Sequence, residues 1–196
     1  MRIILGSSSV RRAEIMRRVV PEFDIIAPNI DENVFPRTSA HSVTIKVACA
    51  KAEAIAAMLS EPALIFTADT VVQMMDGSIR EKPSSENEAR VWLRSYRRFV
   101  PECVTAMYAL RVDGHGGASK DYSALVVDTA SIAFTPFSPQ RIDEIIADGT
   151  AMGWSGAFTM EHPLFSDHIL DVAGDPETIQ GLPSRFLHLT LHLLKD

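Results

Sequence analysis

The chain has 196 residues, enough for one large domain or two closely packed lobes with a sizeable core. Its formal net charge of −6 argues against a protein that coats a nucleic acid polymer, because that task requires a broadly basic surface. No apolar run approaches the roughly 18 residues of a membrane span, so we expect no membrane partner and a cytoplasmic location. Cys49 and Cys103 lie outside any CxxC pair, which argues against a disulfide framework or a zinc site.

Short apolar runs separated by polar loops predict the elements of the first part of the chain. In order, these are a buried strand over residues 2–5, a polar loop over 6–9, a helix over 10–19, a strand over 23–27 ended by Pro28, a helix from Thr38 or Ser39 to Leu59, and a buried strand over 63–68. The alternation of strands with helices is typical of β-α units.

Asp76-Gly77, between the runs 71–75 and 78–80, is a strong signal for a two-residue hairpin. After it we expect a helix from Pro83-Ser84 to about residue 97, β-rich runs over 103–112 and 124–134 around a hairpin tip at 113–120, a helix from Ser138 to Gly149, an irregular stretch with short strands over 150–180, and a C-terminal helix after Ser184. Since β-α units are combined with long hairpins, the sequence predicts an α/β protein with a mixed, twisted sheet and flanking helices.

Residues 7–12, Ser-Ser-Ser-Val-Arg-Arg, lie where the first expected strand passes into the first helix. Free N–H groups at a helix start attract anions, and serine hydroxyls add further donors. Arg11 and Arg12 would then clamp phosphate oxygens. A serine-capped helix with surface arginines explains the same residues, and the spacing is not that of a GxxxxGK[ST] loop.

Charged residues in three other places are candidates for chemistry. Asp69, followed by Thr70, ends a buried strand, where α/β sheets place their ligands, so it would hold a metal or polarise a water. Lys82 precedes a proline that fixes the backbone. Asp31-Glu32 offers carboxylates that suit magnesium, with Lys51 as a nearby candidate cation. Each also has an ordinary interpretation as a turn residue or a solvated surface charge.

The order of these segments along the chain strengthens the functional interpretation of each one. Residues 5–16 resemble the opening signature of the Maf family, which reads roughly LASxSPRRxELL. Other landmarks of the family follow in the same order: Asp31-Glu32, Ala50-Lys51-Ala52, Ala68-Asp69-Thr70, Asp76-Gly77, Glu81-Lys82-Pro83, Glu88-Ala89 and Gly181-Leu182-Pro183. The resemblance covers nearly the whole chain and indicates a single Maf-type domain, residues 1–196, made of two interleaved lobes.

The resemblance implies an elongated, inosine triphosphatase-like α/β fold with a nucleotide cleft between two lobes. It also implies a hydrolase: a house-cleaning nucleoside triphosphate pyrophosphatase that splits a normal or modified NTP into NMP and pyrophosphate by water attack at the α-phosphate. The implied cofactor is Mg²⁺, or another divalent cation such as Mn²⁺. A homodimer is plausible from the family alone.

By the same resemblance, the catalytic residues are Asp69, Lys82 and Glu32. Glu32 and Asp69 would hold the metal, and Asp69 would activate the attacking water. Substrate binding would fall to Ser7, Arg11, Arg12, Lys51, Thr70 and Glu161. The set suits the reaction, because fixed cations and a divalent ion stabilise the charge that develops on the α-phosphate and on pyrophosphate.

The largest departure from the family pattern is at residues 153–161, where Trp154 replaces a lysine and Glu161 a glutamine. By the resemblance, the positions that select the base are Arg11, Thr70 and Glu161. They combine residues similar to those of the dTTP/UTP branch of the family with residues similar to those of the 7-methyl-GTP branch. A carboxylate only accepts hydrogen bonds, so Glu161 favours a base edge rich in donors, such as that of guanine. Trp154 would stack on a cationic methylated guanine, or simply pack.

A non-catalytic nucleotide-binding regulator of septum formation and cell division is the competing class. The altered segment 153–161 keeps that class open, whereas the presence of Glu32, Lys51, Asp69 and Lys82 favours an enzyme. Magnesium-dependent release of pyrophosphate from a panel of nucleotides separates the two classes.

Overall fold

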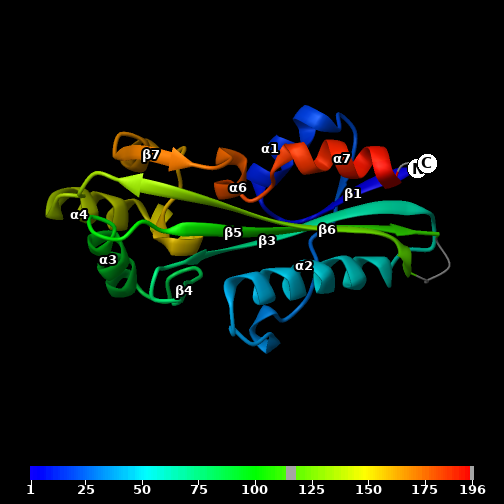
Figure 1. Ribbon diagram of the computed structural model, residues 1–196, viewed down its shortest axis with the longest axis horizontal. Helices are drawn as coiled ribbons and strands as arrows, with labels where there is room; N and C mark the ends of the chain where they lie inside the picture. The colour runs from blue at the N-terminus through cyan, green and yellow to red at the C-terminus, as the bar shows by residue number, and fades with distance from the viewer. Residues whose placement is uncertain (114–117, 195–196) are drawn as a thin grey trace. The chain divides into compact units, whose positions relative to one another are not determined.

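The computed structural model describes residues 1–113 and 118–194, without the side chains of residues 118–121. Helices and strands intermix along the chain (Figure 1). In order, they are β1 (Arg2–Gly6), α1 (Val10–Val19), β2 (Asp24–Ile25), η1 (Glu32–Val34), α2 (Ala40–Ala56), β3 (Ala63–Gln73), β4 (Ile79–Arg80), α3 (Glu86–Ser95), β5 (Glu102–Val112), β6 (Ala118–Phe134), α4 (Pro139–Asp148), η2 (Thr150–Gly153), η3 (Ser155–Ala157), α5 (Pro163–Ser166), β7 (Ile169–Ala173), α6 (Pro176–Ile179) and α7 (Ser184–Leu194), where η marks a 3-10 helix.

The strands form one seven-stranded sheet in the order β2-β1-β3-β5-β6-β7, with β4 paired to β3. β1 is parallel to β2 and to β3, whereas β4 is antiparallel to β3 and β7 is antiparallel to β6. The expected α/β class, with a mixed sheet and flanking helices, is therefore confirmed. In the described part of the chain, no helix is long and apolar enough to cross a membrane.

The chain divides into two compact units, and β3, β5 and β6 contribute residues to both. Unit 1 consists of Met1–Asp69, Thr105–Asp128 and Gly181–Asp196, and unit 2 of Thr70–Val104 and Thr129–Gln180. Each unit is thus assembled from segments that lie far apart in the sequence.

In unit 1, helices cover both faces of the sheet (Figure 1). Leu5 packs in one apolar cluster with Met16 of α1 and Leu187 of α7, whereas Ile4 packs in another with Ile55 of α2. Because both faces of the sheet are buried here, residues 3–5 of β1 and 63–66 of β3 are continuous apolar runs rather than alternating ones.

Unit 2 has its own core around aromatic rings. Tyr96 meets Phe158 edge to face at 5.6 Å between ring centroids, and Phe134 meets Phe158 at 5.2 Å. Leu93 of α3 and Ile145 of α4 belong to the same apolar cluster. Cys103 is buried there as a free thiol, and burial raises its pKa to about 12, which makes it unreactive near neutral pH.

Several boundaries differ from those expected. The strand over 23–27 shrinks to Asp24–Ile25, because both residues are exposed at the sheet edge and bury no apolar face. β3 runs without a break from the expected strand into the hairpin, and β6 begins at residue 118 rather than 124. The length of these strands is set by how their backbones pair with neighbouring strands, and the pattern of apolar residues does not indicate that pairing. Within the expected tip at 113–120, residues 114–117, including His115, lie outside the described residues.

Two other expectations concern turns and the irregular stretch. A hairpin is present at Asp76-Gly77, but its loop has three residues rather than the expected two. The Met74 N–H donates to the Ser78 carbonyl at 2.9 Å, and of Asp76 and Gly77 only Gly77 has a positive φ, 81°, whereas a two-residue Asp-Gly turn needs one at both residues. The stretch over 150–180 contains short helices with the single strand β7, rather than several strands. Three of these helices, η2, η3 and α5, follow one another between residues 150 and 166 and pack onto the core of unit 2.

Candidate active site

The last residue of β1, Gly6, packs closely against α2 and β3 in unit 1. A Cβ atom at Gly6 would lie 2.5 Å from the Ile55 side chain and 2.6 Å from that of Thr67, so only glycine allows this approach. Ser9 then begins α1, and its side chain accepts a hydrogen bond from the Arg12 N–H at 3.4 Å. The serine-capped helix start is therefore present, and it fixes where the two arginines of α1 emerge.

Arg12 is tied to the backbone of unit 1 rather than left in solvent. Its Nε donates to the Gly181 carbonyl at 2.9 Å, and its Nη1 donates to the Ala68 carbonyl at 2.8 Å and to the Ser7 hydroxyl at 3.5 Å. Burial lowers the pKa of Arg12, and the nearby carboxylates of Asp69 and Glu32 partly offset this by raising it. The guanidinium is thus held at a defined position beside two carboxylates.

Lys51 of α2 brings those carboxylates together. Its Nζ lies 2.9 Å from an oxygen of Glu32 and 3.1 Å from Oδ1 of Asp69. The Lys51 and Asp69 side chains are 9% and 12% exposed, whereas that of Glu32 is 46% exposed. One ammonium is therefore shared between a buried carboxylate within β3 and a second carboxylate that reaches solvent. Asp69 does not end the strand, as the sequence suggested, because β3 continues to Gln73.

This cluster, Ser7, Arg12, Glu32, Lys51 and Asp69, contains five of the expected site residues. Two carboxylates that meet at one cation, with a fixed guanidinium nearby, provide oxygen ligands for a hard cation and positive charge for a polyphosphate. Among the described residues, no group of three or more His, Cys, Asp or Glu side chains forms a metal site from protein ligands alone.

Arg11 has a different environment from its neighbour. Its pKa is lowered by burial and raised in part by Glu14, one helical turn further along α1. Consecutive residues on a helix do not face the same way. The charged group that acts on Arg11 is therefore not one of the carboxylates that act on Arg12.

The remaining expected residues, Thr70, Lys82 and Glu161, belong to unit 2. Thr70 is half-buried, and its carbonyl accepts a hydrogen bond from the Ser155 hydroxyl at 3.0 Å. Glu161 is exposed and accepts a hydrogen bond from the Thr159 hydroxyl at 2.5 Å. Lys82 is exposed, with a buried proline after it.

Sequence reasoning missed the part that Ser155 plays in contacting Thr70. The signal was weak: a serine stands where the family pattern has alanine, within the segment already noted as altered. It also missed that Gly181 contributes its carbonyl to Arg12. No side-chain chemistry at a glycine could have suggested this.

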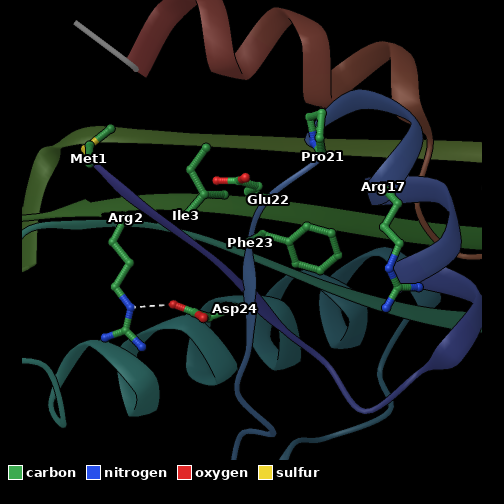
Figure 2. A pocket seen from close by; sticks show the side chains of 8 residues that line it. All are labelled: Met1, Arg2, Ile3, Arg17, Pro21, Glu22, Phe23 and Asp24. Atoms are coloured by element: carbon green, nitrogen blue, oxygen red, sulfur yellow. Dashed lines mark hydrogen bonds and ion pairs between the residues drawn. The ribbon is translucent and has the colours of Figure 1, made fainter.

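A separate open pocket of about 480 Å³ lies in unit 1 around β2, lined by Met1, Arg2, Ile3, Arg17, Pro21, Glu22, Phe23 and Asp24 (Figure 2). Arg2 Nε is already paired with Asp24 at 2.6 Å, and the guanidinium of Arg17 lies 5.7 Å from the centre of the Phe23 ring. None of these lining residues is an expected site residue, so this pocket and the Lys51 cluster are different places.

Comparisons with known proteins agree on the family. The family model described as Maf-like protein matches residues 2–196. A 7-methyl-GTP pyrophosphatase of Dictyostelium discoideum is 29% identical, with 92% of this chain and 91% of that protein covered. A dTTP/UTP pyrophosphatase of Anaeromyxobacter sp. is 30% identical, with 93% and 84% covered.

Among solved structures, a HAM1 protein from Coxiella burnetii matches with a TM-score of 0.51 at 13% sequence identity, over 100% of both chains. This likeness concerns the fold alone, and it agrees with the expected inosine triphosphatase-like architecture. Because the family model covers nearly every residue, the chain belongs to the Maf family.

Proposed function

We propose that the protein is a nucleoside triphosphate pyrophosphatase, a hydrolase that cleaves an NTP into NMP and pyrophosphate. The observation that carries this proposal is the single ammonium of Lys51 joined to both Glu32 and Asp69 beside Arg12. Relatives of similar length that are named nucleotide pyrophosphatases support the same class of reaction. The proposal treats the two units as one Maf-type domain.

The two carboxylates fit a divalent cation. Magnesium is usually bound by one or two protein carboxylates together with substrate phosphates, and Glu32 with Asp69 supplies that number. When bound, Mg²⁺ (or Mn²⁺) would neutralise the charge that develops on the phosphate oxygens. The ammonium of Lys51, 3.1 Å from Asp69, supports this proposal, because opposite charges attract at this point.

We propose that Asp69 acts as the base. Its buried carboxylate orients a water and accepts its proton, while the water oxygen bonds to the α-phosphorus. The bond from the α-phosphorus to the bridging oxygen breaks, and pyrophosphate leaves with the electron pair. Lys51, Arg12 and Lys82 supply the fixed positive charge that this transition state requires.

Base selection is the part of the proposal that depends on unit 2. Glu161 keeps acceptor capacity beyond its bond to the Thr159 hydroxyl, because a carboxylate has four lone-pair sites. Such a group favours guanine, whose edge offers N1–H and N2–H₂, over a pyrimidine. Trp154 is half-buried, and in this proposal its ring stacks on the base.

The test is pyrophosphate release with Mg²⁺ from UTP, dTTP, GTP and 7-methyl-GTP, with Glu161→Gln measured in parallel. We expect release from at least one nucleotide, a higher kcat/KM on a guanine nucleotide, and a shift toward UTP in Glu161→Gln. A wild-type preference for UTP would overturn the role of Glu161. Binding of nucleotides without release would instead support a regulator.

Location and assembly complete the proposal. We expect the enzyme to act in the cytoplasm, where its nucleotide substrates are found, and to form a homodimer. Fractionation of cells and light scattering of the purified protein measure these two properties directly.

A further inference from the structure

Residues 154–157 of unit 2 have an unusual backbone. Gly156 has a φ of 73° and Ala157 a φ of 63°, in the left-handed region that side chains other than glycine seldom adopt. A Cβ atom at Gly156 would lie 2.8 Å from both the Val72 and the Phe158 side chains. The segment is therefore packed closely against β3, and its conformation must be held by the contacts around it.

Hydrogen bonds of Ser155 and Gly156 connect this segment to its surroundings. The Ser155 hydroxyl donates to the Thr70 carbonyl at 3.0 Å, and the Gly156 N–H donates to the Glu81 carbonyl at 3.0 Å. The Tyr96 hydroxyl donates to the Gly156 carbonyl at 2.7 Å. The first two partners are Thr70 itself and the residue directly before Lys82, so the segment joins two stretches that carry expected site residues.

Tyr96 is held in place by several contacts besides its hydrogen bond to Gly156. It follows the end of α3, is only 3% exposed, and contacts Phe158 edge to face. The guanidinium carbon of Arg80 lies 5.2 Å from the Tyr96 ring centre, and Arg80 Nη1 also donates to the Ser95 hydroxyl at 2.9 Å. Burial raises the pKa of Tyr96, so its hydroxyl keeps the proton that it donates.

We propose that Ser155 and Tyr96 are positioning residues, which hold segment 154–157 against Thr70 and Glu81 and thereby set how the base of the nucleotide is discriminated. This inference rests on the proposed function. Neither residue is required to touch the reacting atoms. Ser155 holds the backbone at Thr70 through its hydrogen bond, and Tyr96 holds the backbone of Gly156. The Gly156 N–H in turn donates to the carbonyl of Glu81, the residue before Lys82. The segment then continues toward Glu161.

The experiment compares Ser155→Ala, Ser155→Thr and Tyr96→Phe with the wild type. The readout is the ratio of kcat/KM for the preferred nucleotide to that for a disfavoured one, with kcat and KM reported separately. This ratio does not depend on the fraction of folded enzyme, so a loss of stability alone leaves it unchanged. Ser138→Ala is the matched control, because Ser138 caps α4 in the same unit and its loss affects stability only.

We expect the ratio to fall by roughly 3-fold to 10-fold in Ser155→Ala and in Tyr96→Phe, as loss of one hydrogen bond allows. The fall should come mainly from a higher KM for the preferred nucleotide. Ser155→Thr keeps the hydroxyl and should stay close to the wild type, and Ser138→Ala should keep the ratio at a lower melting temperature.

An active wild type whose ratio is unchanged in both Ser155→Ala and Tyr96→Phe would overturn this inference and leave the proposed function intact. So would equal falls in Ser138→Ala and Ser155→Ala. A wild type that releases pyrophosphate from no nucleotide would overturn the proposed function and this inference with it.

Discussion

Lys51 takes a position between two carboxylates that would otherwise repel each other in a partly buried place. The Asp69 side chain has little access to water, so its negative charge needs a nearby partner, and the ammonium at 3.1 Å provides it. Glu32 is closer, at 2.9 Å, but about half of it remains in solvent. The charges of the proposed site are therefore compensated within the protein itself.

Replacing Asp69 by Asn keeps the shape of the side chain and removes its charge and its ability to accept a proton. We expect pyrophosphate release to fall roughly 100-fold or more, as loss of a general base does. Initial rates with saturating nucleotide and Mg²⁺ measure the effect. Asp171→Asn, at an exposed position of β7, is the control and should keep wild-type rates. Full activity of a folded Asp69→Asn enzyme would remove Asp69 from the role of base.

At the scale of elements, the passage from β1 into α1 depends on the absence of a side chain at Gly6. The end of β1 lies so close to α2 and β3 that an added Cβ atom would contact the side chains of Ile55 and Thr67 at 2.5 and 2.6 Å. Ser7 follows directly, and Arg12 donates both to its hydroxyl and to the Ala68 carbonyl of β3.

Gly6→Ala should lower the free energy of unfolding by about 1–3 kcal/mol, the usual cost of an overpacked site. Urea unfolding followed by circular dichroism measures the change. Gly153→Ala is the control, because a Cβ atom there meets nothing within 4 Å. Equal stability of the two variants would show that the loop moves away from the sheet without cost.

His168, just before β7, makes part of unit 2 sensitive to pH. Its ring lies 4.7 Å from that of Phe137, and its Nδ1 is 3.0 Å from the Thr135 hydroxyl. Burial, followed by Arg141, lowers the pKa of His168 below its ordinary value of 6.5, while Asp167 raises it in part. The folded state therefore binds the proton less readily than the unfolded state does.

The contribution of neutral His168 to the free energy of unfolding is therefore fully present above pH 6.5 and is lost as the pH falls below that value. The urea midpoint of the wild type should decrease more between pH 8 and pH 5 than that of His168→Gln. Parallel decreases in the two proteins would mean that His168 titrates alike in the folded and unfolded states.

At the scale of the whole molecule, the two units are interleaved along the chain. β3, β5 and β6 each supply residues to both units, and unit 1 closes with the C-terminal α7. Neither unit is a continuous stretch of sequence, so neither can be cut out without breaking strands of the sheet. The proposed substrate groups are likewise distributed over segments from residue 7 to residue 161.

A bound nucleotide should therefore stabilise the whole folded chain. A non-hydrolysable analogue with Mg²⁺, at about 100 times its Kd, should add about 2.7 kcal/mol, or roughly 5–10 °C in melting temperature. Differential scanning calorimetry measures this shift. The corresponding nucleoside, which has no phosphates, should leave the melting temperature unchanged. An equal shift with the nucleoside would place most of the binding energy outside the phosphate contacts.

Much of the fold could be predicted from local signals in the sequence. The apolar runs of β1 and β3, the serine that caps α1, the Asp76-Gly77 turn and the glycine after α4 all fix conformation through residues close in the chain. Such signals act over a few residues, so they appear in the sequence itself. The order of the charged motifs along the chain likewise indicates the family.

Only the tertiary structure decided which charges meet. The sequence separates Glu32, Lys51 and Asp69 by long intervals, and nothing local distinguishes Arg12, which is tied to the backbone beside them, from Arg11. Likewise, the bond from Ser155 to Thr70 joins residues 85 positions apart. Contacts of this kind depend on how the strands pair and the helices pack, and pairing over long distances leaves no trace in local patterns.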